Sequence, residues 1–320
     1  MNIGRVFIVD GRLRPIWRFS LSVVLLFVAL LIAGEAIGLV NHLFGIHLQG
    51  MAAMLWGTLA ALPLILAAFK LLTAVFERHP LGSVGLAFHP RWWMELGHGL
   101  AIGGVMILLV AMLERAGGLV QFSYAPQPVL RAASLTFVVL AVAAVNEEAI
   151  FRGYPFQRLV ESITPVGAIA VTSALFGLGH LGNPHHTWIS TTNTMLVGIP
   201  FAIAYLRTRS LWMPIGMHFS WNFLLGFLLG LPVSGITFPV SILQAHVRGA
   251  AWLTGAEYGP EGGLLATGVV AAAILYLSFS KRIFTSKEMR ALVFDPVPMH
   301  EADQPVSTLT MSSKEGSKGD

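Results

Sequence analysis

The stretch Ala141-Val-Ala-Ala-Val-Asn-Glu-Glu-Ala-Ile-Phe-Arg-Gly153 is an apolar helical run that carries two adjacent carboxylates. Glu147 and Glu148 stand side by side in it, and Arg152 follows Glu148 by one helical turn. The whole chain has only 16 acidic residues. Carboxylates inside a hydrophobic segment are costly in a bilayer unless they have a partner, water or a function. This pair therefore decides how the rest of the sequence is interpreted.

Few charges and many apolar residues characterise the chain as a whole. Of its 320 residues, 55% are hydrophobic and 11% are charged, and the mean hydropathy is +0.72. Because soluble proteins carry about 25% charged residues, this composition predicts an all-α, polytopic membrane protein. The lack of cysteine excludes disulfides, thiolate catalysis and cysteine-based metal sites. Any metal would have to be held by His, Glu or Asp.

Eight segments are apolar over a length that suits a membrane helix, for which about 20 residues are needed. The sequence therefore predicts a bundle of eight transmembrane helices, at residues 19–40, 51–76, 96–113, 130–145 with a continuation through the Glu pair, 165–181, 192–206, 211–231 and 263–280. The first segment follows several arginines, as a signal peptide would, but its length favours a retained helix.

Basic residues are distributed unevenly over the connections between these segments. If the N-terminus is cytoplasmic, sixteen Lys and Arg residues lie inside and three lie outside, namely Arg115, Arg131 and Arg248. This is the bias of the positive-inside rule, so both termini are predicted to be cytoplasmic. The formal net charge of +4 is accordingly interpreted as a topology signal, and no nucleic-acid partner is predicted.

These observations divide the chain into three parts. Residues 1–18 are predicted to be a cytoplasmic N-terminal arm, and residues 19–284 a transmembrane helical domain whose core is at 130–231. Residues 285–320 are expected to be a disordered cytoplasmic tail, because they are polar and show no apolar period. In the long connection 232–262, the apolar piece 238–243 is predicted to form a short interfacial helix.

The first polar pair is the one in the opening stretch. Glu148 and Arg152 share one helical face and are predicted to form an ion pair, while Glu147 points about 100° away. Two adjacent carboxylates in a poorly solvated place, one of them beside an arginine, are expected to supply one acid and one base near neutral pH. That arrangement suits general acid–base catalysis on water. The alternative is a purely structural ion pair at the end of the helix.

Two further pairs with the same spacing lie on other predicted spans. Phe176-x-x-x-His180 is on the fifth, although a lone histidine on an apolar helix is more often a hydrogen-bonded packing residue. His218-x-x-x-Asn222 is on the seventh, where the two side chains suit either an oxyanion site or hydrogen bonds between helices. Three such pairs favour one shared site, provided that tilt or a kink at Pro155 brings them to a common depth.

The order of the three pairs resembles the CAAX prenyl protease and bacteriocin-processing (CPBP, or Abi) family of intramembrane proteases. The similarity extends to the run Gly-His-Leu-Gly-Asn-Pro at 179–184, the Asn193-Thr194 pair and segment 206–218, and covers residues 141–223. It implies a membrane endopeptidase whose site opens toward the cytoplasm. No motif residue departs from the family pattern.

The resemblance also implies roles for the motif residues. Glu147 would activate a water with the help of His180, and the oxyanion would be held by His218 and Asn222. The candidate catalytic residues are Glu147, Glu148, Arg152, His180, His218 and Asn222. Whether a divalent metal takes part is left open. Zinc would be held by Glu147, His180 and His218 with a position for water, although no His-Glu-x-x-His motif is present.

The substrate implied is a membrane-inserted or lipidated protein or peptide, and the expected location is a bacterial inner membrane. The sequence does not indicate an oligomeric state. Two other classes of protein use similar residues. A transporter would relay protons through them, but it predicts inverted repeats and broken helices, which are not evident. A non-catalytic scaffold or bacteriocin-immunity protein would bind a partner in the same place and tolerate loss of Glu147.

Overall fold

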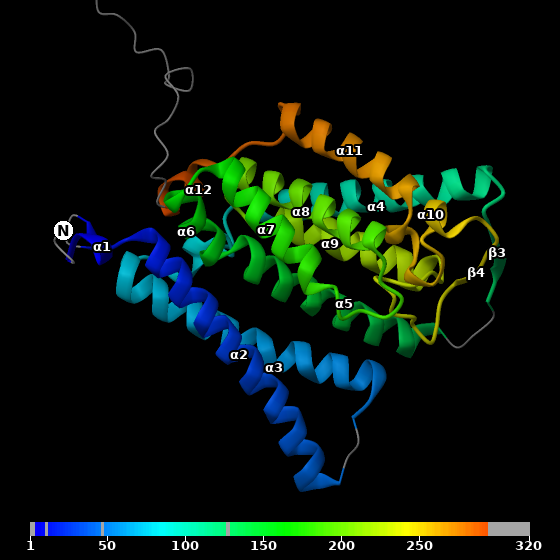
Figure 1. The fold of residues 1–320 in the computed structure, drawn as a ribbon, viewed down its shortest axis with the longest axis horizontal. Helices are drawn as coiled ribbons and strands as arrows, with labels where there is room; N and C mark the ends of the chain where they lie inside the picture. The colour runs from blue at the N-terminus through cyan, green and yellow to red at the C-terminus, as the bar shows by residue number, and fades with distance from the viewer. Residues whose placement is uncertain (1–3, 10–11, 46–47, 126–128, 294–320) are drawn as a thin grey trace, which may run out of the picture.

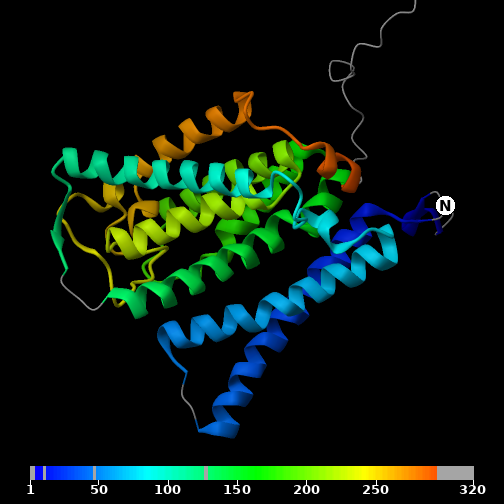
Figure 2. The same ribbon diagram turned by 180° about the vertical axis from the view of Figure 1, so that it is seen from behind.

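A computed structural model of the chain describes residues 4–9, 12–45, 48–125 and 129–293. Within these ranges the chain is a bundle of helices with two small antiparallel sheets (Figure 1, Figure 2). In chain order the elements are α1 (Gly4–Phe7), β1 (Ile8–Val9), β2 (Arg12–Leu13), α2 (Pro15–Phe44), α3 (Gly50–Leu72), η1 (Thr73–Glu77), η2 (Leu81–Val84), α4 (Trp92–Ala116), β3 (Val120–Tyr124), α5 (Val129–Arg152), α6 (Tyr154–Ser162), α7 (Pro165–Gly179), α8 (Trp188–Thr208), α9 (Trp212–Phe223), η3 (Leu224–Leu228), β4 (Leu243–Val247), α10 (Ala251–Thr254), η4 (Ala256–Tyr258), η5 (Pro260–Gly262), α11 (Leu264–Phe279) and α12 (Lys287–Leu292).

Among the residues that the structure describes, five helices are long and apolar enough to cross a membrane. They are α2, residues 50–77 (α3 with η1), α4, residues 133–162 (α5 with α6) and α8. The apolar helices α7 and α11 have only 15 and 16 residues, and α9 continues as η3 after 12 residues. The predicted all-α membrane fold is confirmed, whereas the count of eight spanning helices is not.

The helix that carries the two carboxylates ends earlier than expected. α5 ends at Arg152, Gly153 leaves the helical conformation, and α6 starts at Tyr154. The break is at Gly153, whose ψ of −137° is not helical. Pro155 contributes to it, because it has no N–H to bond a carbonyl of the preceding turn. In the first turn of α6 the missing N–H is tolerated. Two helices therefore replace the single kinked one.

Two predictions for the less regular parts of the chain are wrong. Residues 238–243 form no helix; Leu243 instead begins β4, which pairs with β3. The tail predicted to be disordered from residue 285 begins with α12, where Met289 is buried and the Ser286 hydroxyl accepts from its N–H. The buried Met289 side chain holds this short helix against the rest of the protein, and Ser286 caps its N-terminus. The rest of the tail, 294–320, lies outside the described residues.

The two ends of the bundle differ in the elements that they contain (Figure 1). One end, here called the basic end, contains the N-terminal arm, η1, η2, α6 and α12. The other, here called the hairpin end, contains β3, β4, α10 and the connections 180–187 and 229–263. Basic residues of the described chain at the basic end are Arg12, Arg14, Arg18, Arg78, Arg91, Arg158, Arg207, Arg209, Lys281, Arg282, Lys287 and Arg290.

A buried cluster of charges joins α2 to the core at the basic end. Arg18 donates to both oxygens of Glu77 at 2.7 Å and to Glu161 at 3.1 Å. Arg158 forms ion pairs with the same two carboxylates at 2.9 and 2.8 Å, and Tyr154 donates to Glu77 at 2.9 Å. Because buried charges must be compensated, this arrangement holds α2, η1 and α6 together. Arg18 and Arg158, which the sequence analysis counted as cytoplasmic charges, therefore also stabilise the contact between these helices.

Helices α4 and α9 pack more closely than ordinary side chains would allow. A Cβ atom on Gly99 or Gly103 of α4 would overlap the carbonyl oxygen of Met213 or Met217 in α9. Gly216 of α9 approaches the backbone of α4 in the same way. Small residues four apart are a common device for close contact between membrane helices. This contact positions α9, which carries the third motif pair.

Replacing Gly103 by alanine is expected to lower stability, because the new Cβ overlaps the backbone of α9 and overpacking costs about 1–3 kcal/mol. Gly97→Ala is the matched control, since its Cβ would lie on the same helix and meet no atom within 4 Å. Both changes raise helix propensity equally, so their difference reports the packing. Thermal unfolding of the purified proteins measures it, and equal melting temperatures would contradict the close contact.

Candidate active site

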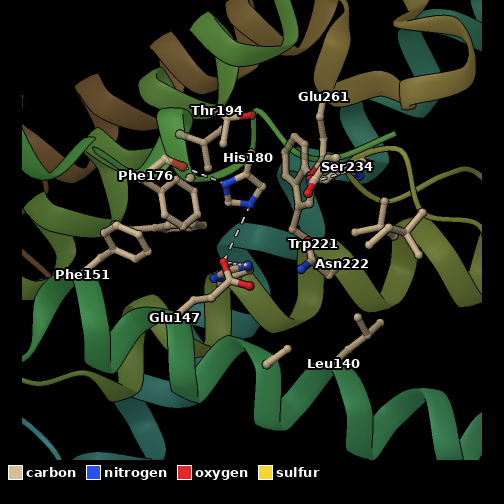
Figure 3. A pocket seen from close by; sticks show the side chains of 18 of the residues that line it. Leu140, Glu147, Phe151, Phe176, His180, Thr194, Trp221, Asn222, Ser234 and Glu261 are labelled. Carbon is tan, nitrogen blue, oxygen red and sulfur yellow. Dashed lines mark hydrogen bonds and ion pairs between the residues drawn. The ribbon is translucent and has the colours of Figure 1, made fainter. Parts of the chain in front are cut away.

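One cavity of about 310 Å³ brings the three motif pairs together (Figure 3). This central cavity is lined from α3, α5, α7, α8 and α9 and from the connections at the hairpin end. Four of the six predicted catalytic residues line it, namely Glu147, His180, His218 and Asn222. Most of its other side chains are apolar, so the few polar groups in it converge on a small space.

Glu147 is the motif carboxylate that faces the central cavity. Its Oε2 lies 3.9 Å from Nε2 of His180 and 3.8 Å from Nε2 of His218, which is longer than a hydrogen bond. Among the described residues, this buried oxygen has no hydrogen-bond partner. Separations of this length between polar groups are commonly bridged by a water. The carboxylate and the two imidazoles therefore surround a place suited to one small polar molecule.

The two histidines are held through Nδ1, but by different partners. Nδ1 of His180 lies 2.7 Å from the carbonyl oxygen of Phe176, and Nδ1 of His218 lies 2.8 Å from Oε1 of Glu148. Both partners are acceptors, so Nδ1 carries a proton in each ring and Nε2 is left to face Glu147. The carboxylate stabilises a positive charge on the His218 ring, whereas the neutral carbonyl gives His180 no such stabilisation.

Glu148 and Arg152 lie behind the central cavity and are fully buried. The predicted ion pair is confirmed, with Nη1 of Arg152 3.2 Å from Oε1 of Glu148. Nη2 of Arg152 also donates to the carbonyl oxygen of Gly198 in α8, at 3.1 Å. Neither residue lines the cavity, so their influence on a bound molecule passes through His218.

Aromatic rings separate this ion pair from the cavity. The Arg152 guanidinium lies over Phe176 at 4.6 Å, Phe201 at 5.3 Å and Phe151 at 5.7 Å from the ring centroids, distances that suit cation–π contacts. The Phe176 ring also packs against His180, with centroids 4.8 Å apart. Phe176 therefore has three tasks: its ring covers the guanidinium and supports the imidazole, and its carbonyl fixes the imidazole tautomer.

Glu261 is a cavity residue that sequence reasoning missed. Its Oε1 accepts from Nε1 of Trp221 at 2.9 Å, and its Oε2 accepts from the backbone N–H and the hydroxyl of Ser234. Asn183 extends this network by donating to the Ser234 carbonyl at 3.0 Å. Burial raises the pKa of the Glu261 carboxyl, and the hydrogen bonds from Ser234 counter that rise. In Figure 3, Glu261 lies to one side of His180, next to Ser234, and Glu147 lies below the ring.

Asn193 fixes the turn that carries Glu261. Its Nδ2 donates to the carbonyl oxygens of Glu261 at 2.9 Å and Gly263 at 2.8 Å, and its Oδ1 accepts from Thr267 at 2.6 Å. The Asn193-Thr194 pair seen in the sequence thus joins α8 to η5 and α11. No sequence signal marks Glu261 itself, since it lies in an irregular connection 68 residues from the asparagine that holds it.

The three residues predicted as zinc ligands do not form a metal site as they are placed. Zinc binds His and Glu at about 2.0–2.2 Å, and no group of three His, Asp or Glu among the described residues is arranged to hold an ion. Glu147 faces both imidazoles, but at 3.8 and 3.9 Å. The metal stays a prediction, and no step proposed below depends on it.

Comparison with known proteins agrees with the motif pattern. Residues 129–224 match a family described as type II CAAX prenyl endopeptidase, Rce1-like. A protein of Bacillus subtilis (strain 168) named "Putative membrane peptidase YdiL" is 32% identical over 95 residues, which are 29% of this chain and 37% of that protein. The match thus spans little more than a third of the relative's length. All three motif pairs lie within residues 129–224, and this segment is similar to the CAAX prenyl endopeptidase family and to a named membrane peptidase.

Proposed function

We propose that the chain is an intramembrane endopeptidase that hydrolyses a peptide bond of a membrane-associated or lipidated protein or peptide. The observation that carries this proposal is the difference between the two histidines. Both present Nε2 to the same oxygen of Glu147, but His218 is paired with a carboxylate and His180 with a carbonyl. One ring is thereby suited to donate a hydrogen bond toward the cavity, and the other to accept one.

In the first step, a water binds between Glu147 and His180. Oε2 of Glu147 takes one proton from it, while the neutral Nε2 of His180 orients it by accepting a hydrogen bond from the other. The water oxygen attacks the carbonyl carbon of the scissile peptide, and the C=O π electrons move to the carbonyl oxygen. A general base placed in this way contributes about 10²–10⁴-fold to the rate.

Two side chains of α9 stabilise the negative charge that forms on the carbonyl oxygen. His218 donates from Nε2–H and Asn222 from its side-chain amide, one helical turn apart, as an oxyanion hole. Glu148 keeps the His218 ring positively charged. When the tetrahedral intermediate collapses, the C–N bond breaks and Glu147 passes its proton to the leaving nitrogen. The products are a carboxylic acid and an amine, and Glu147 is again a carboxylate.

The change Glu147→Gln is expected to lower hydrolysis by at least about 10²-fold, because an amide keeps the shape but cannot act as the base. Membranes that contain the variant should accumulate a bound, uncut protein that is absent from wild-type membranes, which mass spectrometry of the co-purified proteins detects. A partner that stays bound and uncut in the wild type as well would favour a non-catalytic scaffold. Wild-type activity in Glu147→Ala and His180→Ala would contradict the proposal.

Glu148→Gln tests the role of the buried carboxylate. The amide oxygen can still accept from His218, but it no longer stabilises the imidazolium, so kcat should fall by about 10²–10³-fold, as on loss of an oxyanion donor. KM should change little, because Glu148 does not line the cavity. Glu114→Gln is the control, since Glu114 is also buried in the bundle but away from the cavity. Equal kcat values in two variants that both remain folded on thermal unfolding would refute the role.

Treatment with a chelator is expected to leave hydrolysis unchanged, because every proposed step uses a side chain or water. Elemental analysis of wild type and His180→Ala supplies the independent readout. Stoichiometric zinc in the wild type, lost in the variant and accompanied by inactivation on chelation, would make the protein a metalloenzyme and overturn the metal-free mechanism.

A further inference from the structure

The central cavity contains a second carboxylate that the proposed mechanism does not use. Glu261 lines the cavity together with Glu147. Its partners are the indole N–H of Trp221 and the backbone N–H and hydroxyl of Ser234. All three partners donate to it, as they would to an ionised carboxylate. Among the described residues, none forms an ion pair with Glu261, although a buried charge is normally compensated by an opposite one.

The charged groups in and directly behind the cavity leave one negative charge in excess. Three carboxylates and two cations meet there, namely Glu147, Glu148, Glu261, Arg152 and the His218 imidazolium. His180 is neutral in the proposed mechanism, and no lysine or arginine is among the described residues that line the cavity. Because most of the lining is apolar, the effective dielectric constant is low and the excess charge attracts a cation strongly.

Glu261 has room for one more hydrogen bond and is held ready to accept it. A carboxylate offers about four acceptor positions, and the described donors occupy three of them. The backbone is fixed as well, because Asn193 donates to the carbonyl oxygens of Glu261 and Gly263. Since the acceptor is already in place, little conformational freedom is lost when a further donor binds.

The position of Glu261 places that donor near the reacting groups. Glu261 is close enough to His180 for the two side chains to interact electrostatically, and Figure 3 shows it beside the imidazole. Trp221, which donates to Glu261, directly precedes Asn222 of the proposed oxyanion site. A peptide whose scissile carbonyl lies at Asn222 therefore has a neighbouring side chain next to Glu261.

We propose that Glu261 forms a subsite for a basic side chain of the substrate, so that the favoured bond lies near a lysine or arginine of the membrane peptide. The ammonium or guanidinium group takes the free acceptor position and balances the excess charge of the cavity. The methylene stem packs on apolar lining residues such as Val233 and Ile236. The identity of the peptide as a substrate rests on the proposed function, whereas the preference in binding does not.

Pairs of synthetic membrane peptides that differ in one residue test the preference. Each peptide is an apolar helix with a short polar flank, and one flank position carries lysine in one member of the pair and glutamine in the other. The position is moved along the flank, and the peptides are reconstituted in liposomes with the purified full-length protein. At the best position, wild-type kcat/KM should be at least about tenfold higher for the lysine peptide, as for a hydrogen bond between charged groups. Glu261→Gln should abolish this ratio.

Three control variants separate the charge of Glu261 from its hydrogen bonds. Ser234→Ala and Trp221→Phe each remove one donor and keep the carboxylate, so the preference for lysine should persist in both, whatever their kcat. Glu257→Gln removes an exposed carboxylate of the same connection and should retain the wild-type ratio. Loss of the preference in all of these variants would make Glu261 a positioning residue only and overturn the subsite.

Binding supplies a measurement that needs no hydrolysis. Glu147→Gln proteins with and without Glu261→Gln are compared for their affinity toward fluorescent lysine and glutamine peptides. Tighter binding of the lysine peptide, lost with Glu261→Gln, would uphold the subsite; if the wild type cleaves neither peptide, the same result would reject the proposed hydrolysis alone. Equal binding of both peptides to the Glu147→Gln protein would overturn the subsite, whatever the wild type cleaves.

Discussion

A single carboxylate oxygen, Oε1 of Glu148, lies between a guanidinium on its own helix and an imidazole on α9, without exposure to solvent. Breaking such a buried pair leaves an uncompensated charge, which is strongly destabilising. The three charged groups therefore have to stay together, and with the bond from Arg152 to Gly198 they hold α5, α8 and α9 in one arrangement. The same contact sets the protonation and direction of the His218 ring. Stability and the proposed chemistry thus depend on one set of interactions.

The rest of the bundle limits how far α9 can move away from α5. Gly99, Gly103 and Gly216 let α4 and α9 meet backbone to backbone, so neither helix can approach further or slide without collision. On the other side of the site, Asn193 and Glu261 hold an irregular connection against α8 and Trp221. Such rigidity matters, because a displacement of about 1 Å at a catalytic group can lower a rate by 10²-fold.

The sequence predicted what depends on local spacing. Residues four apart lie on the same face of a helix in any environment. The spacing therefore predicted the Glu148–Arg152 ion pair and the position of His180 on the same face as Phe176. The resemblance to a known family then placed the motifs together. Glu261 could not be found in this way, because a contact across 68 residues leaves no periodicity. Nor could the separation of α5 from α6, since it depends on the backbone conformation of the single residue Gly153.

The position of the ion pair within a single helix has a consequence for biogenesis. A lone ionised side chain at the centre of a helix opposes insertion through the translocon by about 2.5–3.5 kcal/mol, but Glu148 and Arg152 can neutralise each other as soon as α5 has formed. His218 has no such partner on its own helix and must find Glu148 after α9 has been synthesised. The site is therefore completed late in synthesis. A nascent chain that has inserted only its first helices therefore carries Glu147 without His218 and Asn222, which the proposed mechanism also requires.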